Sequence, residues 1–214
     1  MRVRVTFHKT AAMRYTGHLD LFRTWERTIR RAGLPLSYSE GFTPRPKMHL
    51  AAALPLGFTS ICELLDVWLD VDLPLPEVEA ALKSAAPPGI FIRGLAAIAA
   101  SEKKLQTLVD SAEYHALLLD PAPANLREQI AALLASESVP RTRRDKPYDL
   151  RPLLLGLAAR PLDAEGRAAL WMHLRARESA TGRPEEVLLA LGIAPDTARV
   201  ERTALHFAED PVSI

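Results

Sequence analysis

The sequence contains very little cysteine, and this limits the chemistry that the chain can carry alone. Cys62 is the single cysteine among 214 residues, so no internal disulfide can form. An iron–sulfur cluster needs several thiolate ligands, which one cysteine cannot supply. A chain without disulfides fits a reducing compartment, and we expect a cytoplasmic protein.

Long apolar runs and the common catalytic motifs are also missing. No stretch reaches the roughly 18 consecutive apolar residues of a membrane helix, so we expect no membrane partner. The opening residues MRVRVTFHKT alternate polar and apolar side chains and do not resemble a signal peptide. G-x-x-x-x-G-K-[ST], G-x-G-x-x-G and G-x-S-x-G are absent. We therefore expect no cofactor, no metal site and no catalytic residue that a motif identifies.

Charge is distributed unevenly along the chain. The formal net charge is only +1, but residues 1–50 carry ten basic and three acidic side chains. Residues 51–100 carry two basic and six acidic side chains. A local positive patch on a nearly neutral protein indicates a specific anionic partner rather than general adhesion to polyanions.

The patch begins with an amphipathic helix, for which Thr16 is the expected N-cap and Gly33 with Pro35 the expected stop. At helical spacing the apolar side holds Leu21, Phe22, Trp25, Ile29 and Ala32. The opposite side holds Arg23, Arg27, Arg30 and Arg31. A solvated charged face is the plain alternative. Only Asp20 and Glu26 accompany the four arginines, and Asp20 is spaced to pair with Arg23.

A proline-rich basic loop follows the helix. Its candidate contacts are Tyr38, Ser39, Phe42, Arg45 and Lys47. Two prolines stiffen the segment and hold its cations at low entropic cost. Single-stranded RNA is bound by aromatic rings that stack on bases and cations that pair with phosphates. We therefore predict RNA as the partner. The alternative is that the aromatic rings fix the loop to its own domain.

Hydrophobic periodicity over residues 1–100 predicts an α+β domain. The element order is β-α-β-β-α-β, which is that of a ferredoxin-like unit. After the strand at residues 3–7 and the basic helix come strands Met48–Leu54 and Glu63–Val71, helix Pro74–Ala85 and strand Ile90–Ile98.

Residues 101–112 are expected to connect this domain to a second one, residues 113–214. Strands are predicted at 113–119, 167–177 and 200–207, and helices at 125–135 and 184–191. Residues 139–160 look irregular. We therefore predict two ferredoxin-like domains, the second distorted.

A second basic segment, VPRTRRDKPYDLRP, lies inside that irregular region. Its candidate RNA contacts are Arg143, Arg144, Lys146, Tyr148 and Arg151. With the first segment it would form one continuous groove if the domains pack side by side. The alternative is a surface loop whose arginines pair with Glu137 and its neighbours.

Four motifs resemble a known bacterial family. They are the run from Thr16 to Lys47, the LPLG of Leu54 to Gly57, the Glu63–Asp66 spacing and the KPYDLRP of Lys146 to Pro152. The family is the radical SAM-linked domain of unknown function. Its members occur as separate chains or fused behind a radical SAM enzyme, near genes for RNA processing and ribosomal proteins. The resemblance implies a radical SAM partner, and the missing CxxxCxxC motif implies that this chain is the accessory part.

We therefore expect a non-enzymatic RNA-binding adaptor that presents RNA to a radical SAM enzyme. One alternative is a metal-independent RNA-processing endonuclease using His8, His18 or His49 for general acid–base catalysis. Another is a protein–protein scaffold without RNA. Asp66 and Asp70 share a strand face but lack a histidine partner, so they make a weak metal pair.

Overall fold

The computed structural model describes residues 1–143, 145–177 and 179–208. The chain is an α+β protein that divides into two compact units, Met1–Val109 and Asp110–Ile214. Arg144, a predicted RNA contact, lies outside the described residues. Within the described part of the chain, no helix is long and apolar enough to cross a membrane.

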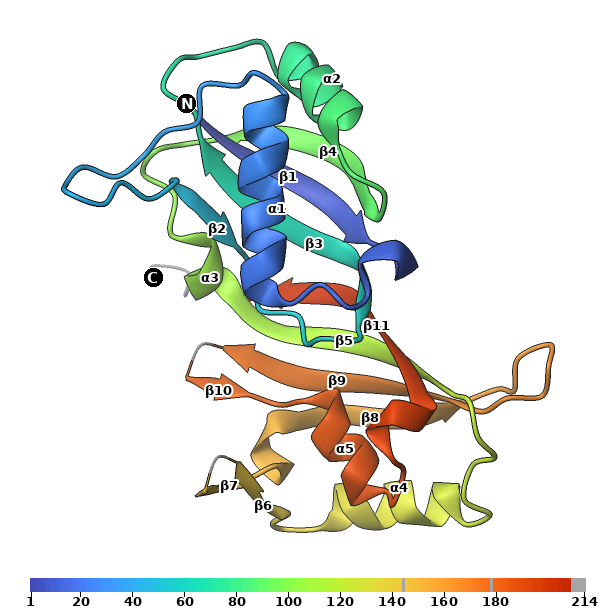
Figure 1. Ribbon diagram of the computed structural model, residues 1–214. Helices are drawn as coiled ribbons and strands as arrows, with labels where there is room; N and C mark the ends of the chain where they lie inside the picture. Colours follow the sequence, from blue (N-terminus) through green and yellow to red (C-terminus); the bar gives the residue numbers. More distant parts are fainter. Residues whose placement is uncertain (144, 178, 209–214) are drawn as a thin grey trace, which may run out of the picture. The chain divides into compact units, whose positions relative to one another are not determined.

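The first unit follows the predicted order of strands and helices. Its elements are β1 (Arg2–Lys9), α1 (His18–Arg31), β2 (Met48–Leu50), β3 (Thr59–Trp68), α2 (Leu75–Ala85), β4 (Ile90–Ile98) and the short α3 (Leu105–Leu108). The strands lie in the order β2-β3-β1-β4, and all neighbours are antiparallel. α1 crosses one face of this sheet, with α2 beside it (Figure 1).

The core of this unit lies between α1 and the sheet. Val3, Val5 and Phe7 alternate along β1 and are buried, as their spacing predicted. Trp25 of α1 is 0% exposed and meets Phe7 edge to face, with ring centroids 4.8 Å apart. The position of α1 is therefore set by its apolar stripe, and its opposite side faces solvent.

The other face of the same sheet carries a buried ion cluster. Asp66 is 0% exposed and accepts hydrogen bonds from the guanidinium groups of both Arg2 and Arg4. Arg2 also donates to the carbonyls of Glu102 and Lys103, which ties the segment after β4 to β1. The carboxylate of Asp66 thus serves an internal ion cluster, and Asp70 accepts from the Ser37 hydroxyl at 2.5 Å.

The second unit contains more strands than predicted. It comprises β5 (Val109–Leu118), α4 (Leu126–Ala135), β6 (Pro140–Arg143), β7 (Lys146–Asp149), β8 (Leu154–Arg160), β9 (Ala169–Arg177), β10 (Ala180–Thr181), α5 (Pro184–Ala190) and β11 (Ala198–Phe207). β9 pairs antiparallel with β5, β8 and β10, and β11 lies beside β5. β6 and β7 form a separate hairpin, with Asp145 in the left-handed region at φ 62°.

Several predicted boundaries were wrong. The region 139–160 is not irregular, because it contains the β6–β7 hairpin and β8. A register shift between Leu154 and Gly156 breaks the alternation that would have revealed β8. β2 ends at Leu50 rather than Leu54, and β3 runs from Thr59 to Trp68 rather than from Glu63 to Val71. The predicted connector 101–112 holds α3 and the start of β5, and Leu105 is buried.

Candidate nucleic-acid interface

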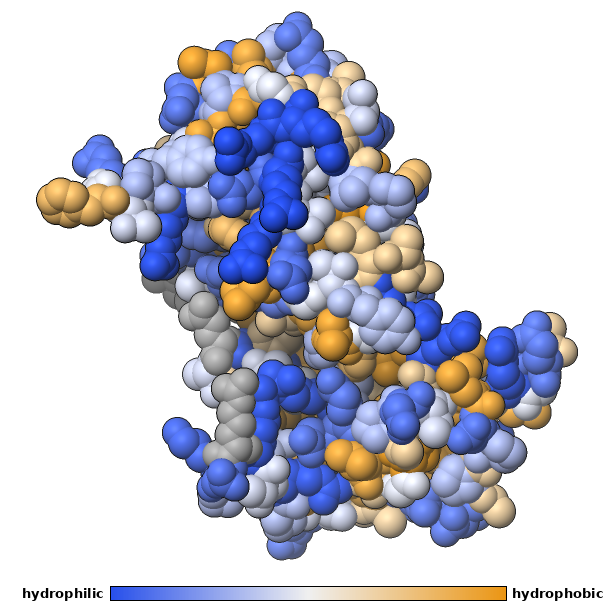
Figure 2. Space-filling view, in the orientation of Figure 1, coloured by the Kyte–Doolittle hydropathy of each residue, from blue (hydrophilic) through white to orange (hydrophobic). Residues whose placement is uncertain are grey.

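The solvent side of α1 presents the predicted arginine row. Arg23, Arg27 and Arg30 are exposed, and Figure 2 shows strongly hydrophilic surface over this helix. Arg23 pairs with Asp20 at 3.6 Å, as the spacing predicted. Arg27 and Arg30 have no ion-pair partner among residues 1–143, 145–177 and 179–208. These two cations are therefore available to an anionic ligand.

The N-terminal end of α1 differs from the prediction, whereas the predicted stop is confirmed: the helix ends at Arg31, and Gly33 follows in the left-handed region at φ 69°. The N-cap is Gly17 rather than Thr16, without a side-chain cap, and the helix begins at His18. Near the C-terminal end of α1, Arg31 differs from Arg27 and Arg30 because its guanidinium has a partner inside the protein. Its Nε donates to the carbonyl of Ala85 at 3.0 Å, and its Nη2 donates to the same oxygen. Ala85 is the last residue of α2, so Arg31 donates to a helix-terminal carbonyl, and its predicted RNA contact stays a prediction.

The basic loop forms a hairpin-like arm, Leu36–Lys47. The backbone N–H of Ser39 donates to the carbonyl of Arg45 at 2.8 Å, and the N–H of Arg45 donates to Ser39 Oγ at 2.9 Å. At the base, the N–H of Lys47 donates to the Ser37 carbonyl at 2.8 Å. Gly41 turns the tip at φ 115°, which a side chain would disfavour. The arm projects from its unit (Figure 1).

The two aromatic rings of the arm behave differently. Phe42 has a relative exposure of 109%, so it does not fix the arm to the domain, and Figure 2 shows apolar surface at the arm's tip. Tyr38 is 37% exposed and its hydroxyl donates to Glu26 Oε1 of α1 at 3.2 Å. Partial burial, followed by the Glu26 carboxylate, raises the pKa of Tyr38. Tyr38 therefore fixes the arm to α1, whereas the Phe42 ring is exposed.

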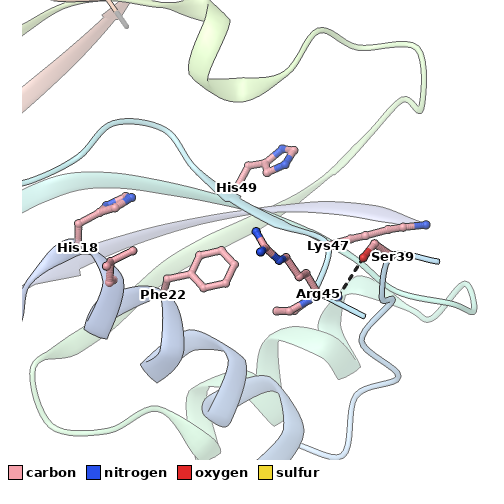
Figure 3. Close-up of a pocket in the computed structure, with 8 residues that line it drawn as sticks. His18, Phe22, Ser39, Arg45, Lys47 and His49 are labelled. Carbon is pink, nitrogen blue, oxygen red and sulfur yellow. Dashed lines mark hydrogen bonds between the residues drawn. The ribbon is translucent and has the colours of Figure 1, made fainter. Parts of the chain in front are cut away.

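A groove of about 470 Å³ lies between the start of α1 and the arm. It is lined by His18, Leu19, Phe22, Ser39, Arg45, Pro46, Lys47 and His49. In Figure 3 Phe22 extends from α1 towards the segment that carries Arg45 and Lys47. Neither Arg45 nor Lys47 has an ion-pair partner within the described ranges. The groove therefore combines apolar walls with two available cations.

The RNA contacts predicted for the adaptor do not include His18, Leu19 or His49, although all three line this groove. His18 and His49 were considered only as acid–base residues of the endonuclease alternative. Leu19 gave a usable signal, because it is an apolar residue outside the buried stripe of the helix. The His49 ring lies edge-on to Trp68 with centroids 5.1 Å apart. Burial, reinforced by the nearby Lys104, lowers the pKa of His49, which favours the neutral imidazole.

In the second unit, the guanidinium of Arg151, a predicted RNA contact, hydrogen-bonds to backbone carbonyls of its own unit. Its Nε and Nη2 donate to the carbonyl of Leu134 at 3.2 and 2.8 Å, and its Nη1 donates to the carbonyl of Leu154 at 2.9 Å. Asp149 closes the base of the hairpin by accepting from the N–H groups of Val139 and Arg151. These two hydrogen bonds lower the pKa of Asp149.

The remaining predicted contacts of this segment lie on the β6–β7 hairpin. Arg143 and Tyr148 line a cavity of about 310 Å³ together with Thr181 and Arg183, and Lys146 is exposed. Burial and the Glu186 carboxylate raise the pKa of Tyr148. This segment and the arm occupy the same place in the order of elements, between the first helix of a unit and the next strand of its main sheet. The predicted continuous groove stays a prediction.

Comparison with known proteins gives a family and a likeness of fold. A family model described as "Uncharacterized protein conserved in bacteria (DUF2344)" matches residues 2–184. No curated protein matches the sequence. A chain in the crystal structure of a Cbf5-Nop10-Gar1 complex is 13% identical with a TM-score of 0.50, and the match covers 97% of this chain and 50% of that one. This chain thus spans half the length of that neighbour, and the likeness concerns the fold alone.

An unknown protein from Galdieria sulphuraria is 16% identical over 97% of this chain and 98% of that one, with a TM-score of 0.26.

Proposed function

We propose that this chain, which belongs to the DUF2344 family of uncharacterized proteins conserved in bacteria, is a non-enzymatic RNA-binding adaptor. The observation that carries the proposal is the groove between α1 and the arm. Phe22 and Pro46 provide apolar walls for an unstacked base, and Arg45 and Lys47 provide charge for the adjoining phosphates. Phe42, fully exposed at the tip of the arm, adds a second ring for stacking.

The arrangement of strands supports a duplicated ferredoxin-like architecture. The first unit has the order β2-β3-β1-β4, and the second has β8-β9-β5-β11. In both, the first strand lies between the last strand and the third strand of the main sheet, which is the arrangement of a β-α-β-β-α-β unit. We infer that the β6–β7 hairpin is an insertion between the first helix and second main strand of the second copy.

A radical SAM enzyme is the proposed protein partner. The proposal is supported by the motifs from Thr16 to Lys47 and from Lys146 to Pro152, which resemble radical SAM-linked proteins. With one cysteine this chain cannot supply the cluster ligands of such an enzyme, so it would hold the RNA while the partner performs the chemistry.

The salt dependence of RNA binding tests the groove. We expect affinity for single-stranded RNA, followed by fluorescence anisotropy, to fall steeply as salt rises. The slope of log K against log salt should be about −0.7 per phosphate contacted. An Arg45→Ala/Lys47→Ala double variant should flatten the slope by about 0.7 for each phosphate that it no longer binds. Lys83→Ala is the matched control, because Lys83 is an exposed cation on α2 that pairs with Glu79. No binding at low salt, or an unchanged slope in the double variant, would contradict the proposal.

Replacing the exposed ring separates stacking from charge. Phe42→Ala should weaken RNA binding by about 1–3 kcal/mol, the usual contribution of one base–aromatic stack, and leave the salt slope unchanged. Because Phe42 is fully exposed, the free energy of unfolding should not change. Leu56→Ala, at an exposed apolar site in another loop, should alter neither quantity. Equal affinities of Phe42→Ala and wild type would remove Phe42 from the site.

The endonuclease alternative has one observation in its favour, since both His18 and His49 line the groove. The lowered pKa of His49 favours the neutral form that a general base requires. We expect no cleavage when purified protein is incubated with RNA, with or without divalent metal. Site-specific cleavage that disappears in His18→Ala or His49→Ala would assign the chain to the nuclease class.

A further inference from the structure

The sheet of the second unit carries a row of rings that the RNA proposal above does not use. Along β9, Leu170, Met172 and Leu174 are buried in the core, while Trp171 and His173 alternate with them on the opposite face. Glu113 of β5 is the cross-strand partner of His173 and lies on the same face. His206 of β11 completes the row, with its ring centroid 4.9 Å from that of His173. Rings from two strands, β9 and β11, therefore share one half-buried surface with the Glu113 carboxylate of β5.

Trp171 is held in place from two directions. A Cβ added at Gly156 of β8 would lie only 2.7 Å from Cζ3 and 2.8 Å from Cη2 of the indole. The ring therefore rests directly on the β8 backbone at a position where no side chain intervenes. Its Nε1–H donates to Glu113 Oε2 at 2.7 Å, which fixes the ring's rotation. The indole is oriented before any ligand arrives, and its polar group is already satisfied.

One ring nitrogen of each neighbouring histidine is satisfied in the same way. His206 Nε2 lies 2.9 Å from Glu113 Oε1, and His173 Nε2 lies 2.8 Å from Ser111 Oγ. These side-chain hydrogen bonds are made inside the protein, and what they leave for a ligand is ring surface. Flat rings whose orientation is fixed by such hydrogen bonds are suited to stacking against another flat ring.

Arginine side chains lie near both ends of this row of rings. The guanidinium carbon of Arg160 lies 5.5 Å from the centroid of the Trp171 ring, a cation–π distance. Arg175 and Arg177 share the carboxylate of Asp110 at the far end of β9. An exposed arginine such as Arg160 can exchange its ring contact for a phosphate when a base takes its place. A ligand with neutral planar bases on a negatively charged backbone fits this combination of rings and cations best, and RNA has that chemistry.

We propose that Trp171, His173 and His206 form a stacking platform for unpaired RNA bases, separate from the groove of the first unit. The inference rests on the proposed RNA-binding function and deepens it, because it assigns a second contact to the same RNA. A protein segment that inserts an arginine or an aromatic side chain over Trp171 is the competing occupant.

Photochemical crosslinking tests the platform without altering the protein. Single-stranded RNA containing 5-iodouridine is bound to the full chain, irradiated, and its crosslinks mapped by mass spectrometry. We expect a crosslink at Trp171. In anisotropy titrations Trp171→Ala should weaken binding about 5- to 150-fold, the range that one stacked base contributes, with the salt slope retained. Trp171→Phe keeps a ring over Gly156 and should stay within about threefold of wild type. Leu189→Ala, an exposed apolar site on α5, is the matched control.

The outcomes separate the platform from the groove. If wild type binds RNA with the expected salt slope but Trp171 does not crosslink, the platform is overturned and the proposed function stands. If the Arg45→Ala/Lys47→Ala variant binds with unchanged slope and Trp171 crosslinks, the platform stands and the groove is wrong. Absence of RNA binding by wild type at low salt overturns both, and leaves the protein segment as the occupant to be sought.

Discussion

The two basic connections of this protein contain similar side chains and use them differently. In the arm of the first unit, Arg45 and Lys47 line a groove and have no ion-pair partner in the part of the chain that the structure describes. In the second unit, Arg151 directs its guanidinium hydrogen bonds to backbone carbonyls. The first connection therefore presents Arg45 and Lys47 to a groove, while the second uses Arg151 to hold its own fold.

The difference follows from what lies within reach of each guanidinium. The carbonyl of Leu134 belongs to the last turn of α4, and the carbonyl of Ala85 ends α2. Such terminal carbonyls have no partner inside their helix, so a nearby arginine supplies one. Arg151 and Arg31 both do this, each for a helix of its own unit. An arginine in a basic segment is therefore less available to a ligand where it donates hydrogen bonds to the terminal carbonyls of a nearby helix.

The largest expected effect comes from removing the buried tryptophan that packs α1 against the sheet. Trp25→Ala should lower the free energy of unfolding by about 3–5 kcal/mol, as for other large buried aromatics. Trp25 is fully buried against Phe7, whereas Arg27, two residues further along α1, faces solvent. Arg27→Ala should change stability by less than about 0.5 kcal/mol. Urea denaturation measures the free energy of unfolding of both variants. Equal losses of stability would show that α1 does not turn its Trp25 side towards the core.

Matched substitutions of Arg151 and Arg45 sharpen the comparison most directly. Arg151→Ala leaves two carbonyls without their donors and should cost about 1–3 kcal/mol of stability, measured by urea denaturation. It should leave the salt slope of RNA binding unchanged. Arg45→Ala should do the reverse, with a stability change below about 0.5 kcal/mol and a flatter slope. Finding that Arg151→Ala flattens the slope without destabilising the protein would return Arg151 to the binding surface.

A smaller effect should appear as acid sensitivity in the second unit. Burial, and then the neighbouring His206, lowers the pKa of His173 below the ordinary value of 6.5. Between the folded pKa and 6.5 the unfolded chain therefore binds more protons than the folded chain, so stability declines as pH falls through this window. Above the window the contribution of His173 to stability is fully retained. His173→Gln should lessen the decline between about pH 7 and 5, as read from urea midpoints. A decline as steep as that of wild type would mean that other groups cause it.

Local periodicity was enough to predict some of this structure and not the rest. The opposed faces of α1 were predictable because Leu21, Trp25 and Ile29 recur at helical spacing, and all three are buried. The element order of the first unit was predictable for the same reason. β8 was missed because its bulge breaks the alternation on which strand prediction depends.

Contacts between residues far apart in the chain could not be predicted from the sequence. Nothing near Arg31 indicates that the end of α2 lies within its reach, 54 residues later in the chain. Trp171 looked like an ordinary strand residue, because its contact with Glu113 spans 58 residues. Conversely, Phe42 could not be separated from a loop anchor until its exposure was known. Local rules describe which side of an element a residue occupies, and only the fold determines what it meets there.

The arm's internal hydrogen bonds have a consequence for the speed of recognition. An arm already closed between Ser39 and Arg45 does not need to become ordered during an encounter, so little entropy is lost at that step. Association should then be limited by diffusion and by long-range attraction between the arginine row and phosphates, which makes the on-rate salt-dependent. Residence time should instead depend on short-range stacking by Phe42. Rapid capture and slow release would thus be set by different residues of the same unit.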